Sequence, residues 1–247
     1  MNASYKRRMA AVFRSSGRKR AYNLRLFAVV APRYNLVTRL LSFGRDAQWK
    51  HWLVNQLPEQ KDAPVCLDLA CGTGDVSFLL EHRFPSGRTL GIDLSPDMLR
   101  IASRHAGHNG VTFIRGDLLR LPVATGRADV VTACYALRNA PNLEQCLAEI
   151  RRVLHRGGKL VILDFARADR TWIARAQVLL LTAWGAFWGA VLHRDPRVYR
   201  YIAESLRAFP ARREFKAKLR AHGFKPCLHR SFFFGMADGL ICECPSP

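Results

Sequence analysis

The segment from Val65 to Glu81 most constrains the fold, because an apolar run ends there in a turn of small residues and continues as a helical pattern. Its sequence is Val-Cys-Leu-Asp-Leu-Ala-Cys-Gly-Thr-Gly-Asp, followed by Val-Ser-Phe-Leu-Leu-Glu. This order predicts a strand, a tight turn and a helix. Gly72 and Gly74 let the backbone turn without Cβ clashes and approach a ligand, and the helix N-terminus presents amides to polar groups. The geometry suits a nucleoside cofactor, although ordinary strand-to-helix loops also carry glycines.

A second short apolar run ends in Gly91-Ile92-Asp93 and places a carboxylate about 20 residues beyond the glycine turn. In a βαβ unit that spacing holds the acid against ribose hydroxyls. Strands are expected at 65–69, 88–92, 111–115, 128–134, 159–164, 224–228 and 239–243, with helical patterns between most of them. Gly157-Gly158 is expected to end a helix and turn into the fifth strand. The pattern predicts an α/β fold, a doubly wound, mostly parallel, Rossmann-like sheet of seven strands.

The composition indicates a folded and strongly basic protein. With 247 residues, 49% of them hydrophobic, the chain can bury a sizeable core, and we expect one catalytic domain with appended elements. Because 39 Lys and Arg face 19 Asp and Glu, the formal charge of +20 attracts nucleic acid or an anionic membrane surface. Seven cysteines, an odd number, indicate free thiols in a reducing compartment. Cys242 and Cys244 lack a nearby His or Cys partner pattern, so no metal site is predicted.

The N-terminal part of the chain, residues 1–44, contains no acidic residue and many arginines and lysines. We interpret residues 1–32 as a basic N-terminal arm, with three alternatives open: a disordered tail, a membrane-surface helix or an Arg-rich segment like a transit peptide. The catalytic domain is expected to occupy residues 33–247 and to include a helical cap at about 168–222.

An apolar stretch at 176–192 reaches the lower limit of membrane-spanning length. Gly185 and Gly189 break it, and it interrupts a soluble α/β pattern. These features favour buried cap helices over the active site, with shallow membrane contact as a variant of that hypothesis.

Polar residues follow four strands of the predicted sheet, at the edge where doubly wound folds bind ligands. Asp93 is expected to accept hydrogen bonds from two ribose hydroxyls, Asp117 from an exocyclic amine, and the Leu118 amide is expected to reach a ring nitrogen. Each acid alone also fits a helix cap or turn, but three at successive strand ends are hard to explain as caps. The set predicts adenosine recognition. The predicted cofactor-binding residues are Asp68, Gly72, Thr73, Gly74, Asp93, Asp117, Leu118 and Cys134.

Two cofactors contain adenosine and fit such a site, a dinucleotide and S-adenosylmethionine. Dinucleotide sites use three glycines spaced G-x-G-x-x-G to approach a pyrophosphate. This turn lacks the third glycine, and Asp75 would repel phosphate. The ammonium and carboxylate of a methionine meet no such objection, so we interpret the ligand as the methyl donor S-adenosylmethionine.

Several segments together resemble one enzyme family, the ubiquinone/menaquinone biosynthesis C-methyltransferases of UbiE type, which are class I S-adenosylmethionine-dependent enzymes. The resemblance covers roughly residues 33–243. The glycine turn is shared by many methyltransferases, whereas the Leu-Arg-Asn and Tyr-Arg-Tyr…Glu-Ser segments are much more specific. The segments that carry it are Leu67–Asp75, Leu137–Asn139, Arg151–Gly158, Tyr199–Ser205 and Arg39–Gly44.

The resemblance implies an acceptor that is a quinol ring carrying a polyprenyl tail. It also implies that a ring carbon, made nucleophilic by an ionised neighbouring hydroxyl, attacks the sulfonium methyl. Deprotonation is then the main step that the protein assists, and positioning supplies much of the rest. The candidate catalytic residues are Arg138, Asn139 and Tyr201. Arg138 is expected to lower the pKa of the acceptor hydroxyl or to orient a water, and Asn139 to hold that water. Tyr201, with Tyr34 and Tyr199, is expected to wall the acceptor pocket.

Three departures from the family pattern lie around the acceptor side. Asp46-Ala47 replaces the usual His-Arg, Tyr135-Ala136 replaces Phe-Gly, and residues 235–240 differ from the usual Gly-Ile-Val-Ala-Leu-His. Cofactor use therefore follows more directly than acceptor identity. A methyltransferase for another apolar aromatic molecule stays open, as do an RNA methyltransferase and a non-catalytic binding scaffold.

The expected surroundings of the protein follow from its charge and from the apolar cap. We expect peripheral contact with an anionic membrane, where a prenylated quinol resides. The compartment would be the cytoplasm, or the mitochondrial matrix side in a eukaryote. Nucleic acid is disfavoured as a partner because Ala133–Ala136 lacks the Asn/Asp-Pro-Pro-aromatic loop of amino-methylating enzymes. A homodimer is left open.

Overall fold

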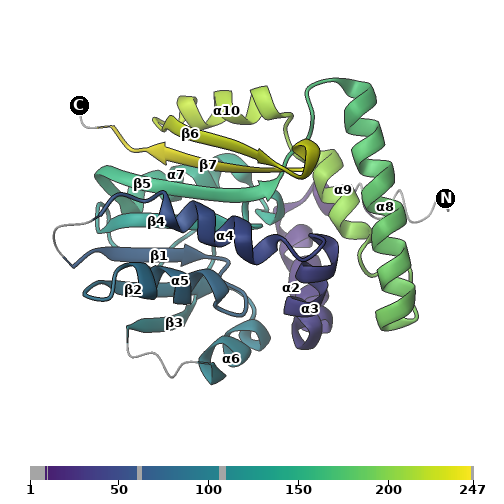
Figure 1. Cartoon of the computed structure of the whole chain (residues 1–247), viewed down its shortest axis with the longest axis horizontal. Helices are drawn as coiled ribbons and strands as arrows, with labels where there is room; N and C mark the ends of the chain where they lie inside the picture. The colour runs from purple at the N-terminus through teal and green to yellow at the C-terminus, as the bar shows by residue number, and fades with distance from the viewer. Residues whose placement is uncertain (1–8, 10, 60–62, 106–109, 246–247) are drawn as a thin grey trace.

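The computed structural model describes residues 9, 11–59, 63–105 and 110–245. At its centre is a seven-stranded sheet in the order β3-β2-β1-β4-β5-β7-β6 (Figure 1). Strands β1 to β5 are parallel, whereas β7 pairs antiparallel with both β5 and β6. The strands are β1 Val65–Leu69, β2 Arg88–Asp93, β3 Val111–Arg115, β4 Ala128–Cys134, β5 Leu154–Phe165, β6 Lys225–Phe232 and β7 Ala237–Glu243. The predicted fold class is confirmed.

Side chains of the sheet form one apolar layer on each face. The covering helices are α4 Asp46–Asn55, α5 Asp75–Arg83, α6 Pro96–Arg104, α7 Leu143–Val153 and α10 Arg212–Ala221. Leu67 and Leu69 of β1 pack with α7 and α10 on one face, while Cys66 packs with α4 and α5 on the other. Helices cover both faces of the parallel strands, so these strands consist mainly of apolar residues. Polar residues that could bind a ligand therefore lie mostly at the strand ends.

A helical cap stands beyond the carboxyl ends of the parallel strands (Figure 1). It comprises α2 Ser16–Val30, η1 Ala31–Arg33, α3 Tyr34–Leu41, α8 Thr171–His193 and α9 Arg200–Ala208. Two short 3-10 turns complete this end of the molecule, η2 Leu137–Asn139 after β4 and η3 Phe233–Gly235 between β6 and β7. The cap therefore closes over the edge of the sheet where the predicted site residues lie.

Helix α2 occupies part of the expected basic arm, and it packs directly on η2. The ammonium of Lys19 donates hydrogen bonds to the carbonyls of Arg138 (3.1 Å) and Ala140 (2.6 Å), and Asn23 Nδ2 donates to the carbonyl of Asn139 (2.8 Å). Burial, together with the charge of Arg138, lowers the pKa of Lys19 to about 8. Residues 16–30 are thus a docked helix, and residues 1–8 and 10 of the arm lie outside the described residues.

Helix α8 corrects the expectation that 176–192 is broken by its glycines into buried helices. It is one helix through both Gly185 and Gly189. A Cβ at Gly185 would lie 3.2 Å from Tyr199 Cβ, and one at Gly189 only 2.6 Å from the Asp195 carbonyl oxygen. The glycines therefore serve close packing against the following segment and α9 rather than breaking the helix. The outward face of α8 is exposed, and by length and composition α8 would suffice to cross a membrane.

The expected turn at Gly157-Gly158 is also wrong. Helix α7 ends at Val153, and β5 begins at the next residue, so both glycines lie inside the strand. Gly157 has a φ of +84°, and its amide donates to the carbonyl of Cys244 (2.7 Å). Gly157 does adopt the left-handed conformation that the sequence suggests, but it forms a local irregularity within β5 instead of a turn before the strand.

Candidate active site

The glycine turn after β1 is tied to the end of β2 by Asp93. Gly72 has a φ of +56° and donates its amide to Asp93 Oδ2 (2.9 Å), while Asp93 Oδ1 accepts from the amide of Ser95 (2.8 Å). Gly74 has a φ of +90° and precedes α5, and a Cβ there would lie 2.9 Å from the Phe113 ring. Burial raises the pKa of Asp93, with the two amide hydrogen bonds opposing that rise. The conformation of the turn is thus fixed by the hydrogen bond to Asp93 at Gly72 and by the packing of Phe113 against Gly74.

Asp68 lies beneath this turn and is buried. Its two oxygens accept hydrogen bonds from the hydroxyls of Ser77 and Thr132, both at 2.7 Å. Burial raises the pKa of Asp68 to about 6 from 3.8, although both hydroxyls favour the charged form. Asp68 therefore connects β1, β4 and α5 in addition to facing a ligand recess.

We expect the contribution of Asp68 to stability to fall as pH rises. Between a pKa of 3.8 unfolded and about 6 folded, the folded chain holds a proton that the unfolded chain has lost. The free energy of unfolding therefore drops by up to about 3 kcal/mol across that interval. The side chain that the Asp68→Asn variant carries at this position cannot titrate. Measured by urea unfolding, the free energy of unfolding of this variant minus that of wild type should therefore rise by up to about 3 kcal/mol between about pH 4 and about pH 7. Parallel pH profiles for the two proteins would contradict this.

The larger cavity at the strand ends, called here the strand-end cavity, has about 730 Å³ of empty space including its opening. Gly72, Asp93, Asp117 and Leu118 line one side, and α2 and Tyr34 close the other. Arg20 of α2 pairs with Asp117 at 3.3 Å. Its lining residues are Arg20, Asn23, Leu24, Phe27, Tyr34, Ala70, Gly72, Ile92, Asp93, Leu94, Ser95, Met98, Gly116, Asp117, Leu118, Tyr135, Ala136, Asn139 and Pro141.

A narrower recess, called here the lysine recess, continues from the strand-end cavity and shares three of its lining residues. The lining residues are Tyr34, Lys50, Asp68, Ala70, Cys71, Thr73, Asp75, Val76, Cys134 and Tyr135. The hydroxyl of Thr73 donates to Asn35 Oδ1 (2.7 Å). Burial raises the pKa of the Cys134 thiol, which makes it a poor nucleophile. Seven of the eight predicted cofactor residues thus line two connected spaces, and Gly74 instead shapes the turn beside them.

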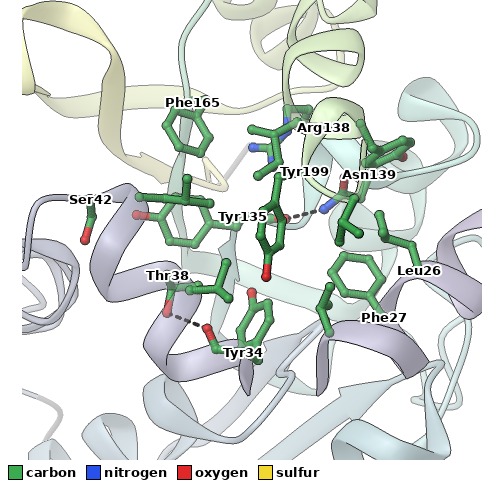
Figure 2. Close-up of a pocket in the computed structure, with 16 residues that line it drawn as sticks. Leu26, Phe27, Tyr34, Thr38, Ser42, Tyr135, Arg138, Asn139, Phe165 and Tyr199 are labelled. Carbon is green, nitrogen blue, oxygen red and sulfur yellow. Dashed lines mark hydrogen bonds between the residues drawn. The ribbon is translucent and has the colours of Figure 1, made fainter. Parts of the chain in front are cut away.

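A third space, called here the aromatic cavity, adjoins the strand-end cavity and is lined largely by residues of the cap (Figure 2). The rings of Tyr34, Tyr135 and Tyr199 surround it. Phe27, Tyr34, Tyr135 and Asn139 line both this cavity and the strand-end cavity, so the two adjoin at these residues, which form a shared wall. Its lining residues are Leu26, Phe27, Val30, Tyr34, Val37, Thr38, Leu41, Ser42, Tyr135, Arg138, Asn139, Phe165, Val198, Tyr199, Tyr201 and Ile202.

Arg138 lines the aromatic cavity, but its guanidinium is already engaged. Nη1 pairs with Asp164 Oδ1 at 2.5 Å, Nε donates to Ser205 Oγ at 2.8 Å, and the group lies over the Phe165 ring. Burial raises the pKa of Asp164, and Arg138 opposes that rise. The positive charge of Arg138 is therefore matched inside the protein, which limits its effect on the pKa of a bound hydroxyl.

Asn139 and Tyr201 occupy different positions around η2. Asn139 Nδ2 donates to the Tyr135 carbonyl (2.8 Å), while its buried Oδ1 has no hydrogen-bond partner among the described residues. Asn139 therefore keeps an acceptor at the wall between the two cavities. Tyr201 is buried, stacks with Phe13 at 5.8 Å and lies 5.1 Å from the Tyr22 ring of α2, so it packs toward the N-terminal part of the chain. Burial raises the pKa of Tyr201, which disfavours ionisation at neutral pH.

Several residues of the site were missed from the sequence. Lys19, Arg20 and Asn23 lie in the segment interpreted as a basic arm, and Asp46 and Lys50 form an ion pair at 2.6 Å one turn apart on α4. The i,i+4 spacing of an acid and a base was a usable signal for that pair. The docking of α2 on η2 could not be predicted from the sequence, because a basic helix has the same composition whether it lies in solvent or against η2.

Comparison with known proteins gives a family and a fold. The profile of the ubiE/COQ5 methyltransferase family matches residues 16–241. Demethylmenaquinone methyltransferase of Thermus thermophilus is 39% identical and aligns with 81% of this chain and 91% of its own length. The ubiquinone/menaquinone biosynthesis C-methyltransferase UbiE of Syntrophotalea carbinolica is 34% identical over 90% of this chain and 93% of its own.

Solved structures share the fold at low sequence identity. A chain from the complex between the Haloferax volcanii Trm112 methyltransferase activator and the putative methyltransferase has a TM-score of 0.65 at 16% identity, covering 89% of this chain and 98% of that one. Geranyl diphosphate C-methyltransferase from Streptomyces coelicolor, solved with S-adenosyl-L-homocysteine, has a TM-score of 0.59 at 14% identity, covering 79% and 78%. Both likenesses concern the fold alone.

Proposed function

The chain belongs to the ubiE/COQ5 methyltransferase family, and from this premise we propose that its two adjoining cavities carry out C-methylation of a quinol ring in quinone biosynthesis. The cofactor is S-adenosylmethionine. One observation carries the proposal for this chain: the strand-end cavity, which the carboxylates of Asp93 and Asp117 line, shares the lining residues Phe27, Tyr34, Tyr135 and Asn139 with the aromatic cavity. The methyl transfer would take place beside these residues, where the two cavities adjoin.

The chain's residues fit the methyl donor. Asp93 and Asp117 present carboxylates at two neighbouring strand ends of the strand-end cavity, where ribose hydroxyls and an exocyclic amine require acceptors. The lysine recess offers both signs of charge, which a methionine zwitterion requires. When bound, S-adenosylmethionine supplies an electrophilic methyl group on a sulfonium. We propose that the adenosine part lies in the strand-end cavity and the methionine part in the recess.

On the acceptor side, positioning is the main contribution of the protein. Asn139 Oδ1 is free to accept a hydrogen bond from a hydroxyl of the quinol, or from a water molecule that removes the proton of that hydroxyl. Arg138, held by Asp164 and Ser205, keeps η2 and therefore Asn139 in place. Tyr201, Tyr199 and the other rings supply an apolar wall for a flat ring. These roles extend the roles predicted from the sequence and stay proposals.

A radiolabelled methyl-transfer assay tests the proposed function. Demethylmenaquinol with a prenyl tail, a small apolar phenol and total RNA are offered in parallel with labelled S-adenosylmethionine. We expect label in the prenyl quinol. Label only in the phenol would support a different apolar aromatic acceptor, and label only in RNA would refute the quinol proposal.

We also propose that the cap end of the molecule rests on an anionic membrane. In the part of the chain that the structure describes, the large exposed hydrophobic side chains lie on α2, α3, the turn after it, α8 and η3, and Leu179 (71% exposed) and Phe234 (100%) are among them. Helix α8 carries no acidic residue, and Arg167, Arg175 and Arg207 line a groove along it. An apolar face edged by arginines fits an anionic lipid surface. Attachment at the cytoplasmic face, or the matrix face in a eukaryote, follows as part of this proposal; the homodimer stays a prediction.

Replacing Trp172, Leu179 and Phe187 together with Ser should lower binding to anionic liposomes at least about tenfold, because each exposed side chain loses apolar area to bury. Flotation at two salt concentrations measures it. The control replaces Lys216 and Arg220 on α10, which removes charge away from α8 and should cost much less. No loss in the triple variant, together with a clear loss in the control, would show that net charge alone holds the protein at the membrane.

A further inference from the structure

The lysine recess has one cationic side chain. Among its described lining residues, Lys50 is the sole Lys, Arg or His, and the acids are Asp68 and Asp75. The recess meets the strand-end cavity at Tyr34, Ala70 and Tyr135, which line both. Asp75 stands in the first turn of α5, directly after the glycine turn. A ligand that extends from the strand-end cavity past the glycine turn therefore reaches Lys50.

Lys50 is buried and held by two carboxylates. Its Nζ lies 2.6 Å from Asp46 Oδ2 and 3.3 Å from Asp75 Oδ2, over the ring of Tyr135 at 5.9 Å, and only 6% of the side chain is exposed. Burial lowers the pKa of Lys50, but Asp46 and Asp75 more than offset this and leave it raised. The ammonium is therefore charged at neutral pH and stays within the recess.

The two carboxylates are not equivalent. The Asp46 side chain is 8% exposed and makes the shorter contact, one turn away on the same helix. The Asp75 side chain is 37% exposed, makes the longer contact, and also accepts from the Thr73 hydroxyl (3.1 Å). Asp46 is thus the permanent partner of Lys50, whereas Asp75 can turn toward an incoming cation without leaving a charge unpaired.

We propose that Lys50 is the counter-ion of the methionine carboxylate of S-adenosylmethionine and that Asp75 pairs with its ammonium. The proposal rests on the function proposed above. On binding, the carboxylate takes the place of Asp75 at Lys50, and Asp75 takes the ammonium, so each buried charge keeps an opposite partner. Lys50 is a positioning residue: by fixing the methionine end, it sets how far the sulfonium methyl reaches toward the shared wall at Tyr34 and Tyr135.

The test compares ligands that differ only at the methionine end. S-adenosylhomocysteine carries both charges, its decarboxylated analogue keeps the ammonium, and 5′-methylthioadenosine lacks both. Removing Lys50 alone would leave Asp46 buried and unpaired, so Lys50→Met is made in an Asp46→Asn background, and Asp46→Asn alone is the control. Affinities are measured by titration calorimetry. Binding of 5′-methylthioadenosine also shows that each variant is folded.

Relative to Asp46→Asn, the double variant should bind S-adenosylhomocysteine about ten- to hundredfold more weakly, the value of one charged hydrogen bond. Its affinity for 5′-methylthioadenosine should be unchanged, and its affinity for the decarboxylated analogue should not fall. Equal weakening for all three ligands, or none for any, would overturn the proposal. In the wild-type protein, equal affinity for S-adenosylhomocysteine and its decarboxylated analogue would overturn it without any variant. Wild-type protein that binds none of the ligands would refute the proposed function itself.

Discussion

Arg138→Leu should lower the free energy of unfolding by about 3–5 kcal/mol, because it leaves the Asp164 carboxylate buried without its charged partner. Asp164 is 3% exposed, and Arg138 contacts it through both the backbone amide and Nη1. Ser205 Oγ would lose its donor as well. Urea unfolding followed by circular dichroism measures the loss, and a variant within about 1 kcal/mol of wild type would show that the pair is not a stability element.

The paired variant Arg138→Leu/Asp164→Leu separates structure from chemistry. It removes both charges, so no buried carboxylate is left unpaired, and part of the lost stability should return. If Arg138 positions η2 and Asn139 beside the acceptor, turnover stays low in this variant although it binds S-adenosylhomocysteine normally. Recovery of stability and turnover together would show that Arg138 is purely structural.

Asp93→Ala should weaken binding of S-adenosylhomocysteine at least about hundredfold, since each charged hydrogen bond is worth about 1.5–3 kcal/mol and more than one is lost. Asp93 accepts from the amides of Gly72 and Ser95 and also lines the strand-end cavity. Its removal therefore releases the glycine turn and deletes the proposed acceptor for ribose. Titration calorimetry gives the affinity.

The matched control is Asp97→Ala. Asp97 lies four residues further along, at the start of α6, and its carboxylate pairs with Arg100 at the surface. It carries the same charge change without touching the turn, so the cofactor affinity should be unchanged. Normal binding by Asp93→Ala, or an equal loss in both variants, would contradict the assignment of Asp93.

The sheet and the glycine turn could be predicted because their signals are local. A buried parallel strand reads as an apolar run, and Gly72 and Gly74 do adopt positive φ, as a turn after Leu69 requires. Asp93 was predictable for the same reason, since its position follows from one βαβ unit.

The cap was less predictable because its form depends on tertiary contacts. Gly185 disfavours a helix locally, yet α8 continues through it because Tyr199 packs where a side chain would stand. Lys19 reads as one more basic residue, and only the η2 carbonyls show why it is buried. Contacts between segments more than a hundred residues apart leave no periodic trace in the sequence.

Two of the three departures from the family pattern meet in the structure. Burial raises the pKa of Tyr135, and the nearby carboxylate of Asp46 raises it further. In the sequence the two changes are far apart: Tyr135 directly follows β4, and Asp46 begins α4. Tyr135 of the aromatic cavity is therefore electrostatically coupled to the Asp46–Lys50 pair, so substitutions at the two positions should be made together.

The position of the transferred methyl group tests the account most directly. The protein is incubated with ¹³C-methyl S-adenosylmethionine and a demethylated prenyl quinol, and the purified product is analysed by NMR. The account predicts one new ¹³C methyl group bound to a ring carbon, with loss of the proton that this carbon carried. Label on a quinol oxygen, or a quinol that acquires no label while S-adenosylmethionine binds normally, would contradict it.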